Sequence, residues 1–170
     1  MADAHIEHVI ECTDETFWKV FFDPEYNRGL FLRELGFDSW KQVSLDERED
    51  RIERVVDVVP RLGDLPGPLK RLVEGGASYR ERDSFDRKAK RMTLAIEPSV
   101  LQGKLTVSGV MRTEPAGDRR CRRIYDTTIV AKIFGLGGMI EGRIVADVRA
   151  SYDRAAAFTN RWVKEQGLEG

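Results

Sequence analysis

Hydrophobic side chains recur at every second position through most of residues 37–134, which is the period of strands with one buried face. Asp, Gly and Pro residues typical of turns divide this region into six segments. They predict strands at residues 37–45, 48–60, 77–85, 91–97, 101–114 and 120–134, in addition to a first strand at residues 4–12. Only residues 62–73 interrupt them at length, with one or two helical turns, so the strands are predicted to pair as an antiparallel meander.

Helical spacing replaces this alternation between the first and second strands. Thr13 is predicted to cap a first helix that carries Asp14 and Glu15 in its first turn and ends near residues 23–24. A second short helix is predicted at about residues 25–35. Neither helix contains a chemical motif, so both are interpreted as packing elements.

The last part of the chain predicts one long helix, from about residue 138 to residue 166. Apolar and small side chains recur along it at steps of three and four residues, at Ile140, Ile144, Val148, Ser151, Ala155, Phe158 and Trp162. At about 1.5 Å per residue this helix is about 40 Å long. Small residues concentrate near its centre, which favours close packing on the predicted sheet.

The order of the predicted elements resembles the helix-grip fold of the START-like superfamily, also called SRPBCC or Bet v 1-type. The runs GASYRERDSF, SVLQGKLTVSGVMRTEP and RRIYDTTIVAKIFGLGGMIEGRIVADVRASYDRAAAFTNRWV resemble an uncharacterised bacterial branch of it. In addition, GLGGMIEG before FTNRWV is similar to sterol-transporting VASt domains. The resemblance implies one α+β domain over residues 1–170, in which about seven antiparallel strands form a curved sheet around the C-terminal helix. It also implies a cavity between sheet and helix, and it carries over no catalytic motif.

The strand faces independently favour a cavity between the sheet and the long helix. Alternation places one set of side chains on the inner face, and Gly103 and Gly109 mark where a strongly bent strand needs no side chain. The predicted ligand-contacting residues are Met92, Leu94, Ile96, Leu105, Val107, Met111, Tyr125, Thr127, Ile129, Ile144, Val148, Ser151 and Ala155. The alternative is an ordinary filled core. Small helix residues favour unfilled volume, namely Ala146, Ala150, Ser151, Ala155, Ala156 and Ala157.

Two apolar, glycine-hinged connections are candidates for the entrance of this cavity. The candidates are Leu65, Pro66 and Leu69 on the first connection, and Phe134, Leu136 and Met139 on the second. Exposing large apolar side chains indicates contact with a ligand or a membrane surface. The alternative is that the second connection only turns the chain into the long helix.

Tyr79, Glu81 and Asp83 are the polar candidates for the cavity. If Tyr79 faces inward, both carboxylates share its face, and buried carboxylates must be paired or protonated. They can then bind a hydroxyl or amine of a ligand, and together with Tyr125 they can supply acid–base chemistry. The alternative is an ion-pair ladder on the outer face of the sheet.

Charge and composition exclude several other classes. The chain has 28 basic and 29 acidic side chains and a net charge of −1, so a strongly basic nucleic-acid-binding protein is not expected. Four arginines cluster at residues 119–123, where a solvated strand end is favoured over an anion-binding surface. No apolar run reaches about 18 residues and no secretory signal is recognised, so a cytoplasmic protein is expected.

Motifs for metal binding and nucleophilic catalysis are not found. His5 and His8 lie at positions of opposite strand parity, and Cys12 and Cys121 are predicted to be buried free thiols. The glycines at residues 135–137 lack the third glycine of a dinucleotide-binding fingerprint. Neither a metal nor another cofactor is therefore expected.

The leading hypothesis is a non-catalytic module that binds one hydrophobic small molecule between the sheet and the long helix. The resemblance implies a sterol, phospholipid, fatty acid or polyketide as ligand, and exchange with membranes through transient surface contact. The alternative is a cyclase- or hydrolase-type enzyme that acts on a hydrophobic substrate in the same cavity. A third hypothesis is a protein-interaction domain that uses the edge at residues 120–123.

Overall fold

Seven strands form one antiparallel sheet in the order β1-β7-β6-β5-β4-β3-β2. The computed structural model describes residues 1–169. The strands are β1 (Ala2–Ile10), β2 (Ser39–Glu47), β3 (Arg51–Val59), β4 (Tyr79–Asp86), β5 (Arg91–Pro98), β6 (Leu105–Pro115) and β7 (Cys121–Ala131). Strands β2 to β7 follow chain order, and β1 joins the far edge beside β7. The predicted meander is confirmed, with strand ends shifted by a few residues.

The helices are α1 (Asp14–Phe21), α2 (Pro24–Arg28), η1 (Gly29–Glu34), α3 (Gly67–Leu72) and α4 (Gly137–Glu165). The Thr13 hydroxyl accepts a hydrogen bond from the backbone N–H of Thr16 at 3.2 Å, which confirms the predicted cap. The second predicted helix divides into the short α2 and the π-helical η1. Within residues 1–169, no helix is both long and apolar enough to cross a membrane.

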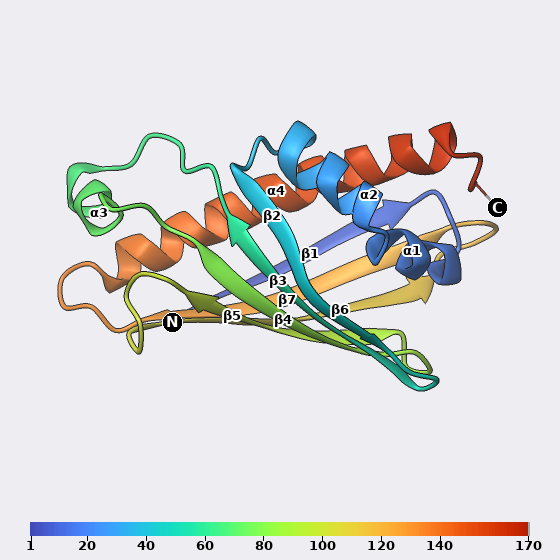
Figure 1. The fold of residues 1–170 in the computed structure, drawn as a ribbon, viewed down its shortest axis with the longest axis horizontal. Coiled ribbons are helices and arrows are strands. Elements are labelled where there is room, and N and C mark those ends of the chain that lie inside the picture. The colour runs from blue at the N-terminus through green and yellow to red at the C-terminus, as the bar shows by residue number, and fades with distance from the viewer. Residues whose placement is uncertain (170) are drawn as a thin grey trace.

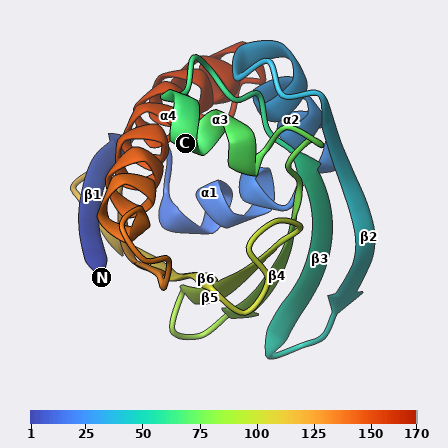
Figure 2. The same ribbon diagram turned by 90° about the vertical axis from the view of Figure 1, so that its left-hand side faces the viewer.

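The sheet curves around α4, so that sheet and helix together surround the interior (Figure 1, Figure 2). Helix α4 packs against β1 and β7, while β2 and β3 curl up on the opposite side (Figure 2). Helix α1 lies toward one end of the interior, and α3 and the loop between β7 and α4 lie at the other end (Figure 1). This arrangement confirms the predicted α+β helix-grip architecture.

Aromatic side chains fill the end of the interior that α1 closes. Trp18 stacks on Phe85 of β4 with ring centroids 4.2 Å apart, and its indole N–H donates to the Thr113 hydroxyl at 2.7 Å. Phe17 and Phe22 are buried in the same cluster. Burial of each such ring contributes about 1.5–3 kcal/mol. This end of the molecule is therefore a packed core.

The apolar stripe of α4 has two parts with different partners. Its C-terminal part packs on α2, because Phe158 and Trp162 lie 5.6 and 5.8 Å, between ring centroids, from Tyr26. Its N-terminal part, over residues 140–155, faces the space between helix and sheet. The long helix thus closes the core at one end and borders open space at the other.

The small residues near the centre of α4 do not all face the interior. Ala146, Ala150 and Ala157 are exposed, whereas Ala155 and Ala156 are buried. The expectation that the whole small-residue set leaves interior volume was wrong for the three exposed alanines. Residues one or two positions apart on a helix point in different directions, so they cannot all share the inner face.

Gly109 is required by close packing inside β6, whereas Gly103 lies outside the strand. Gly103 adopts a positive φ of 74° in the turn before β6, which corrects its predicted place in the strand. A Cβ atom at Gly109 would lie 2.6 Å from Tyr125 Cε2 and 2.9 Å from the Asp126 carbonyl oxygen. Since the second contact is with backbone, a side chain at this position forces β6 and β7 apart.

Replacing Gly109 by alanine is expected to lower the free energy of unfolding by about 1–3 kcal/mol, because the added methyl group overpacks the β6–β7 contact. Urea denaturation followed by circular dichroism measures the change. Gly142→Ala is the matched control: Gly142 lies in α4, and nothing lies within 4 Å of the place that its new methyl group would take. It should gain about 0.5–1 kcal/mol from helix propensity. Equal effects of the two substitutions would contradict the packing argument.

Candidate functional site

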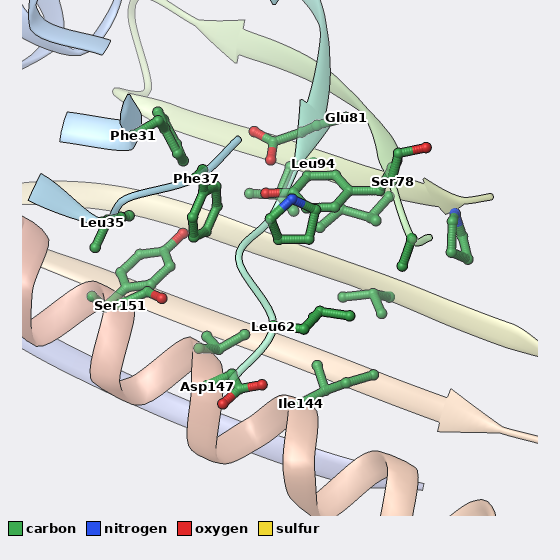
Figure 3. Close-up of a pocket in the computed structure, with 18 of the residues that line it drawn as sticks. Phe31, Leu35, Phe37, Leu62, Ser78, Glu81, Leu94, Ile144, Asp147 and Ser151 are labelled. Carbon is green, nitrogen blue, oxygen red and sulfur yellow. The ribbon is translucent and has the colours of Figure 1, made fainter. Parts of the chain in front are cut away.

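A cavity of about 350 Å³ lies between the concave face of the sheet and α4. Figure 3 shows Glu81 and Leu94 on its strand side and Ile144, Asp147 and Ser151 on its helix side. Its walls are mainly aliphatic and aromatic side chains. Small-molecule sites in proteins typically have volumes of about 300–1,000 Å³ and apolar walls with few polar groups. The cavity therefore has the size and lining of a site for one small molecule.

Most of the predicted ligand-contacting residues line this cavity, namely Met92, Leu94, Ile96, Leu105, Val107, Met111, Tyr125, Ile144, Val148, Ser151 and Ala155. Thr127 and Ile129 do not line it, which corrects their predicted position. Both are buried on the inner face of β7, but α4 packs against that strand. The Thr127 hydroxyl donates instead to the Ser108 carbonyl at 2.8 Å. Contact of the lining residues with a ligand stays a prediction.

The short helices also supply part of the wall, although they are predicted to serve packing alone. Phe21, Tyr26, Leu30 and Phe31 line the cavity from α1, α2 and η1. Tyr26 and Leu30 are four residues apart, so they share one helix face. That spacing identifies an inward face, but it does not show whether the face meets a core or a cavity.

Three arginines that are not among the predicted site residues also line the cavity: Arg143 at its opening, and Arg54 and Arg123 in its interior. Arg54 and Arg123 are buried, with 3% of each residue exposed. Arg54 occupies the same strand face as the buried Ile52 and Val56. The sequence signal for Arg54 was its position, because it is a basic residue on the otherwise apolar face of an alternating strand.

The cavity opens at the α3 end, where its most exposed lining residues lie. Leu62 and Asp147 border it there and are exposed to solvent (Figure 3). Arg143 Nη1 donates to the Asp64 carbonyl at 2.7 Å, and Arg143 Nε donates to the Asp147 carboxylate at 3.0 Å. Arg143 therefore ties the segment after β3 to α4 across this opening.

The predicted entrance residues divide into two groups. Those that line the cavity or pack beside it are Leu65, Leu69 and Leu136. Those that do not line it are Pro66, Phe134 and Met139, whose role at the entrance stays a prediction. Phe134 is fully exposed and Met139 is 46% exposed. The first connection thus borders the cavity, while the second presents its largest side chains to the outside.

Asp83 is held in a buried ion pair and does not line the cavity. Its Oδ2 lies 2.9 Å from both Nε and Nη2 of Arg54, and the side chains are 0% and 3% exposed. The two residues are direct cross-strand partners on β4 and β3. The Arg54 guanidinium also lies 4.8 Å from the centroid of the Phe21 ring. The outer-face ladder is therefore wrong for Asp83, which faces inward.

Glu81 lines the cavity and has no ion-pair partner among residues 1–169. Burial, followed by the negative charge of the neighbouring Asp83, raises the pKa of Glu81 well above its ordinary value of 4.5. Burial likewise raises the pKa of Tyr125 to about 12 and that of Tyr79 well above its usual range. These shifts favour the protonated form of all three groups, in which each can donate a hydrogen bond.

The arginine cluster before and within β7 is divided between the two faces of the sheet. Arg120 pairs with Glu11 at 3.0 Å, and Arg122 pairs with Glu114 at 3.0 Å, both at the surface. Arg123 points inward. The predicted solvated strand end is confirmed for Arg120 and Arg122, and it was wrong for Arg123.

The cysteines and histidines lie outside the cavity wall. Cys12 and Cys121 are buried free thiols, as predicted. His5 is exposed, and the hydrogen bonds that its ring donates to the carboxylates of Asp126 and Glu7 raise its pKa. In the part of the chain that the structure describes, no three His, Cys, Asp or Glu residues are grouped so that they can hold a metal ion.

Comparisons with known proteins identify a family and a fold. A family model described as a protein of unknown function (DUF2505) matches residues 5–163. No curated protein matches the sequence. The crystal structure of TTHA0849 from Thermus thermophilus is similar with a TM-score of 0.67 and 15% identity, over 97% of this chain and 99% of that one.

Two similar solved structures are enzymes by name. The Zhui aromatase/cyclase from Streptomyces sp. R1128 has a TM-score of 0.69 and 11% identity, over 97% of this chain and 96% of that one. Norcoclaurine synthase from Thalictrum flavum has a TM-score of 0.63 and 15% identity, over 96% of this chain and 87% of that one. At such identities the likeness shows the Bet v 1-type helix-grip fold alone. It gives no support to the similarity with VASt domains.

Removing the Glu81 proton site should change how stability depends on pH. A carboxyl that stays protonated in the folded state, but ionises above about pH 4.5 when unfolded, makes the free energy of unfolding fall as pH rises. Glu81→Gln cannot ionise, so the variant should gain stability over the wild type above pH 4.5 and match it more closely below. Urea denaturation across this range measures the difference.

Glu97→Gln is the matched control for this experiment. Glu97 lies on the neighbouring strand β5, with its side chain 57% exposed beside Arg82. Its substitution should leave the pH dependence close to that of the wild type. Parallel stability curves for the wild type and Glu81→Gln would contradict the raised pKa.

Proposed function

The chain belongs to the DUF2505 family, whose description assigns no activity. We propose that the protein binds one hydrophobic small molecule between the sheet and α4. The observation that carries the proposal is the cavity of about 350 Å³ beside an otherwise packed aromatic core. Open apolar volume of this size lowers stability unless a ligand fills it. The resemblance to START-like proteins supports a sterol, phospholipid, fatty acid or polyketide as ligand.

The polar groups of the cavity support a ligand with one polar end. Tyr79, Glu81 and Tyr125 are protonated donors in walls that are otherwise mainly apolar. Apolar walls bury the body of such a molecule, and a few placed polar groups set its orientation. A structure of norcoclaurine synthase, which shares the fold, is described in complex with dopamine and hydroxybenzaldehyde.

The exposed side chains near the cavity mouth support transient contact with a membrane surface. Phe134 and Met139 are exposed. The loop between β7 and α4 and the first turn of α4 lie at the same end of the molecule as α3 (Figure 1). Lys132 and Lys104 flank this apolar tip and are joined by a backbone hydrogen bond of 2.7 Å. Apolar side chains next to basic ones suit an anionic lipid surface. Exchange of a ligand with membranes and a cytoplasmic location remain predictions.

Filling the cavity with a large side chain is expected to abolish binding. Ser151 lines the helix side, so Ser151→Trp places an indole in the ligand volume. Nile red, a neutral hydrophobic dye, should bind the wild type, and the variant should bind at least about tenfold more weakly. Fluorescence titration measures both affinities.

Ala157→Trp is the control, because Ala157 lies on the same helix but is exposed to solvent. This variant should bind Nile red as the wild type does. A folded wild-type protein that does not bind the dye, or a Ser151→Trp variant that binds it unchanged, would contradict the proposed function.

A cyclase- or hydrolase-type enzyme is the second candidate function, and the state of Glu81 favours it. A protonated carboxyl that faces a substrate cavity can act as a general acid. Tyr79 and Tyr125 line the same cavity and stay candidates for proton transfer. Asp83 is no longer a candidate for proton transfer, because its carboxylate is held in the ion pair with Arg54.

Conversion of a metabolite by the wild type, and its loss in Glu81→Gln, would distinguish the enzyme from the binding module. A metabolite extract of the source organism is incubated with each protein and analysed by mass spectrometry. An enzyme should deplete at least one compound, and Glu81→Gln should lower that rate by about 100-fold or more while it still binds Nile red. If no compound changes, or if both proteins convert it equally, the catalytic role of Glu81 is refuted.

A further inference from the structure

Arg123 is a buried cation in the cavity wall that the proposed function does not use. It lies on the inward face of β7, two residues before Tyr125, and 3% of it is exposed. The preceding residue, Arg122, lies on the opposite face of the strand, where it is exposed to solvent and pairs with Glu114 and Glu7. Strand alternation therefore separates a paired surface arginine from an interior one.

The partners of Arg123 within residues 1–169 are neutral. Its Nη2 donates to His8 Nδ1 at 2.9 Å and to the Tyr152 carbonyl at 3.1 Å. Since a guanidinium only donates, His8 accepts at Nδ1 and carries its proton on Nε2, which donates to Asp153 at 2.7 Å. His8 is thus a neutral imidazole between the arginine and that exposed carboxylate. The Arg123 Nε–H is buried and has no hydrogen-bond partner.

The other charged groups of the cavity do not balance this cation. Asp83 neutralises Arg54 through the buried ion pair, and Asp147 pairs with Arg143 at the mouth. Glu81 forms no ion pair with Arg123 or with any other residue among residues 1–169, and its burial favours the neutral form. Burial lowers the pKa of Arg123, although an arginine side chain stays charged at neutral pH. A buried charge without a counter-ion is costly, so this one creates a place for an anion.

We infer that Arg123 binds the carboxylate of a ligand whose apolar body occupies the cavity. A carboxylate at the free Nε–H edge gains a charge-assisted hydrogen bond and supplies the missing counter-charge. The ligand class is then an amphipathic monoanion, a fatty or aromatic carboxylic acid, rather than a neutral sterol. The inference rests on the proposed function, because it names the ligand of that same cavity.

Two ligands that differ only in their polar end test this inference on the wild-type protein. Isothermal titration calorimetry at neutral pH compares decanoate with decanol, which have chains of equal length. Decanoate should bind about tenfold or more tightly, as a charge-assisted hydrogen bond in a buried site predicts. Equal binding of both ligands would overturn the role of Arg123 and leave the proposed function standing. Binding of neither would refute both.

Neighbouring arginines provide the matched variants. Arg123→Gln removes the buried charge and should reduce the preference for decanoate to about twofold or less, while decanol binding changes little. Arg122→Gln removes the same charge from the outer face of β7 and should keep the wild-type preference. A preference that persists in Arg123→Gln would also overturn the inference. If that variant does not fold, the comparison of the two ligands on the wild type decides the question.

Discussion

The buried ion pair between Arg54 and Asp83 is the interaction on which the interior depends. It joins opposing residues of β3 and β4, and the Arg54 guanidinium lies over the rings of Phe21 and Phe22. Either partner alone would be a buried, uncompensated charge, which costs about 3–5 kcal/mol. The pair thus ties the sheet to the aromatic core, and the charge of its carboxylate adds to burial in raising the pKa of Glu81. The Arg54–Asp83 pair thus lies between the packed aromatic end and the cavity, and it contributes to the raised pKa of Glu81 in the cavity wall.

The elements and one wall of the cavity could be predicted because they depend on local geometry. Period-two alternation on β5 is enough to place Met92, Leu94 and Ile96 on one face, and three strands with the same property define a concave wall. The α4 stripe likewise follows from helical spacing, and Thr13 marks the start of α1. The fold then follows from the order of these elements, since few topologies accommodate a meander and one long helix.

The details that could not be predicted depend on contacts between distant segments. Ile129 has the same parity as Tyr125, but only the position of α4 shows that one is covered and the other lines the cavity. Glu81 and Asp83 also share a face, and their states differ because Arg54 is paired across the strands with Asp83. Arg123 has the same parity as Tyr125, so alternation places it on the predicted inner face, but it does not show that the buried Arg123 Nε–H has no hydrogen-bond partner there.

The two ends of the cavity differ in what must break before a molecule can pass. At the α1 end a route would disrupt stacked aromatic rings and a buried ion pair. At the α3 end the covering structure is a six-residue helix and the hydrogen bond from Arg143 to the Asp64 carbonyl. Local opening of such a segment needs far less free energy than unfolding of a core. For the proposed ligand, the less costly route is therefore the one that residues 60–73 cover, and this segment serves both as the cover of the cavity and as part of its wall.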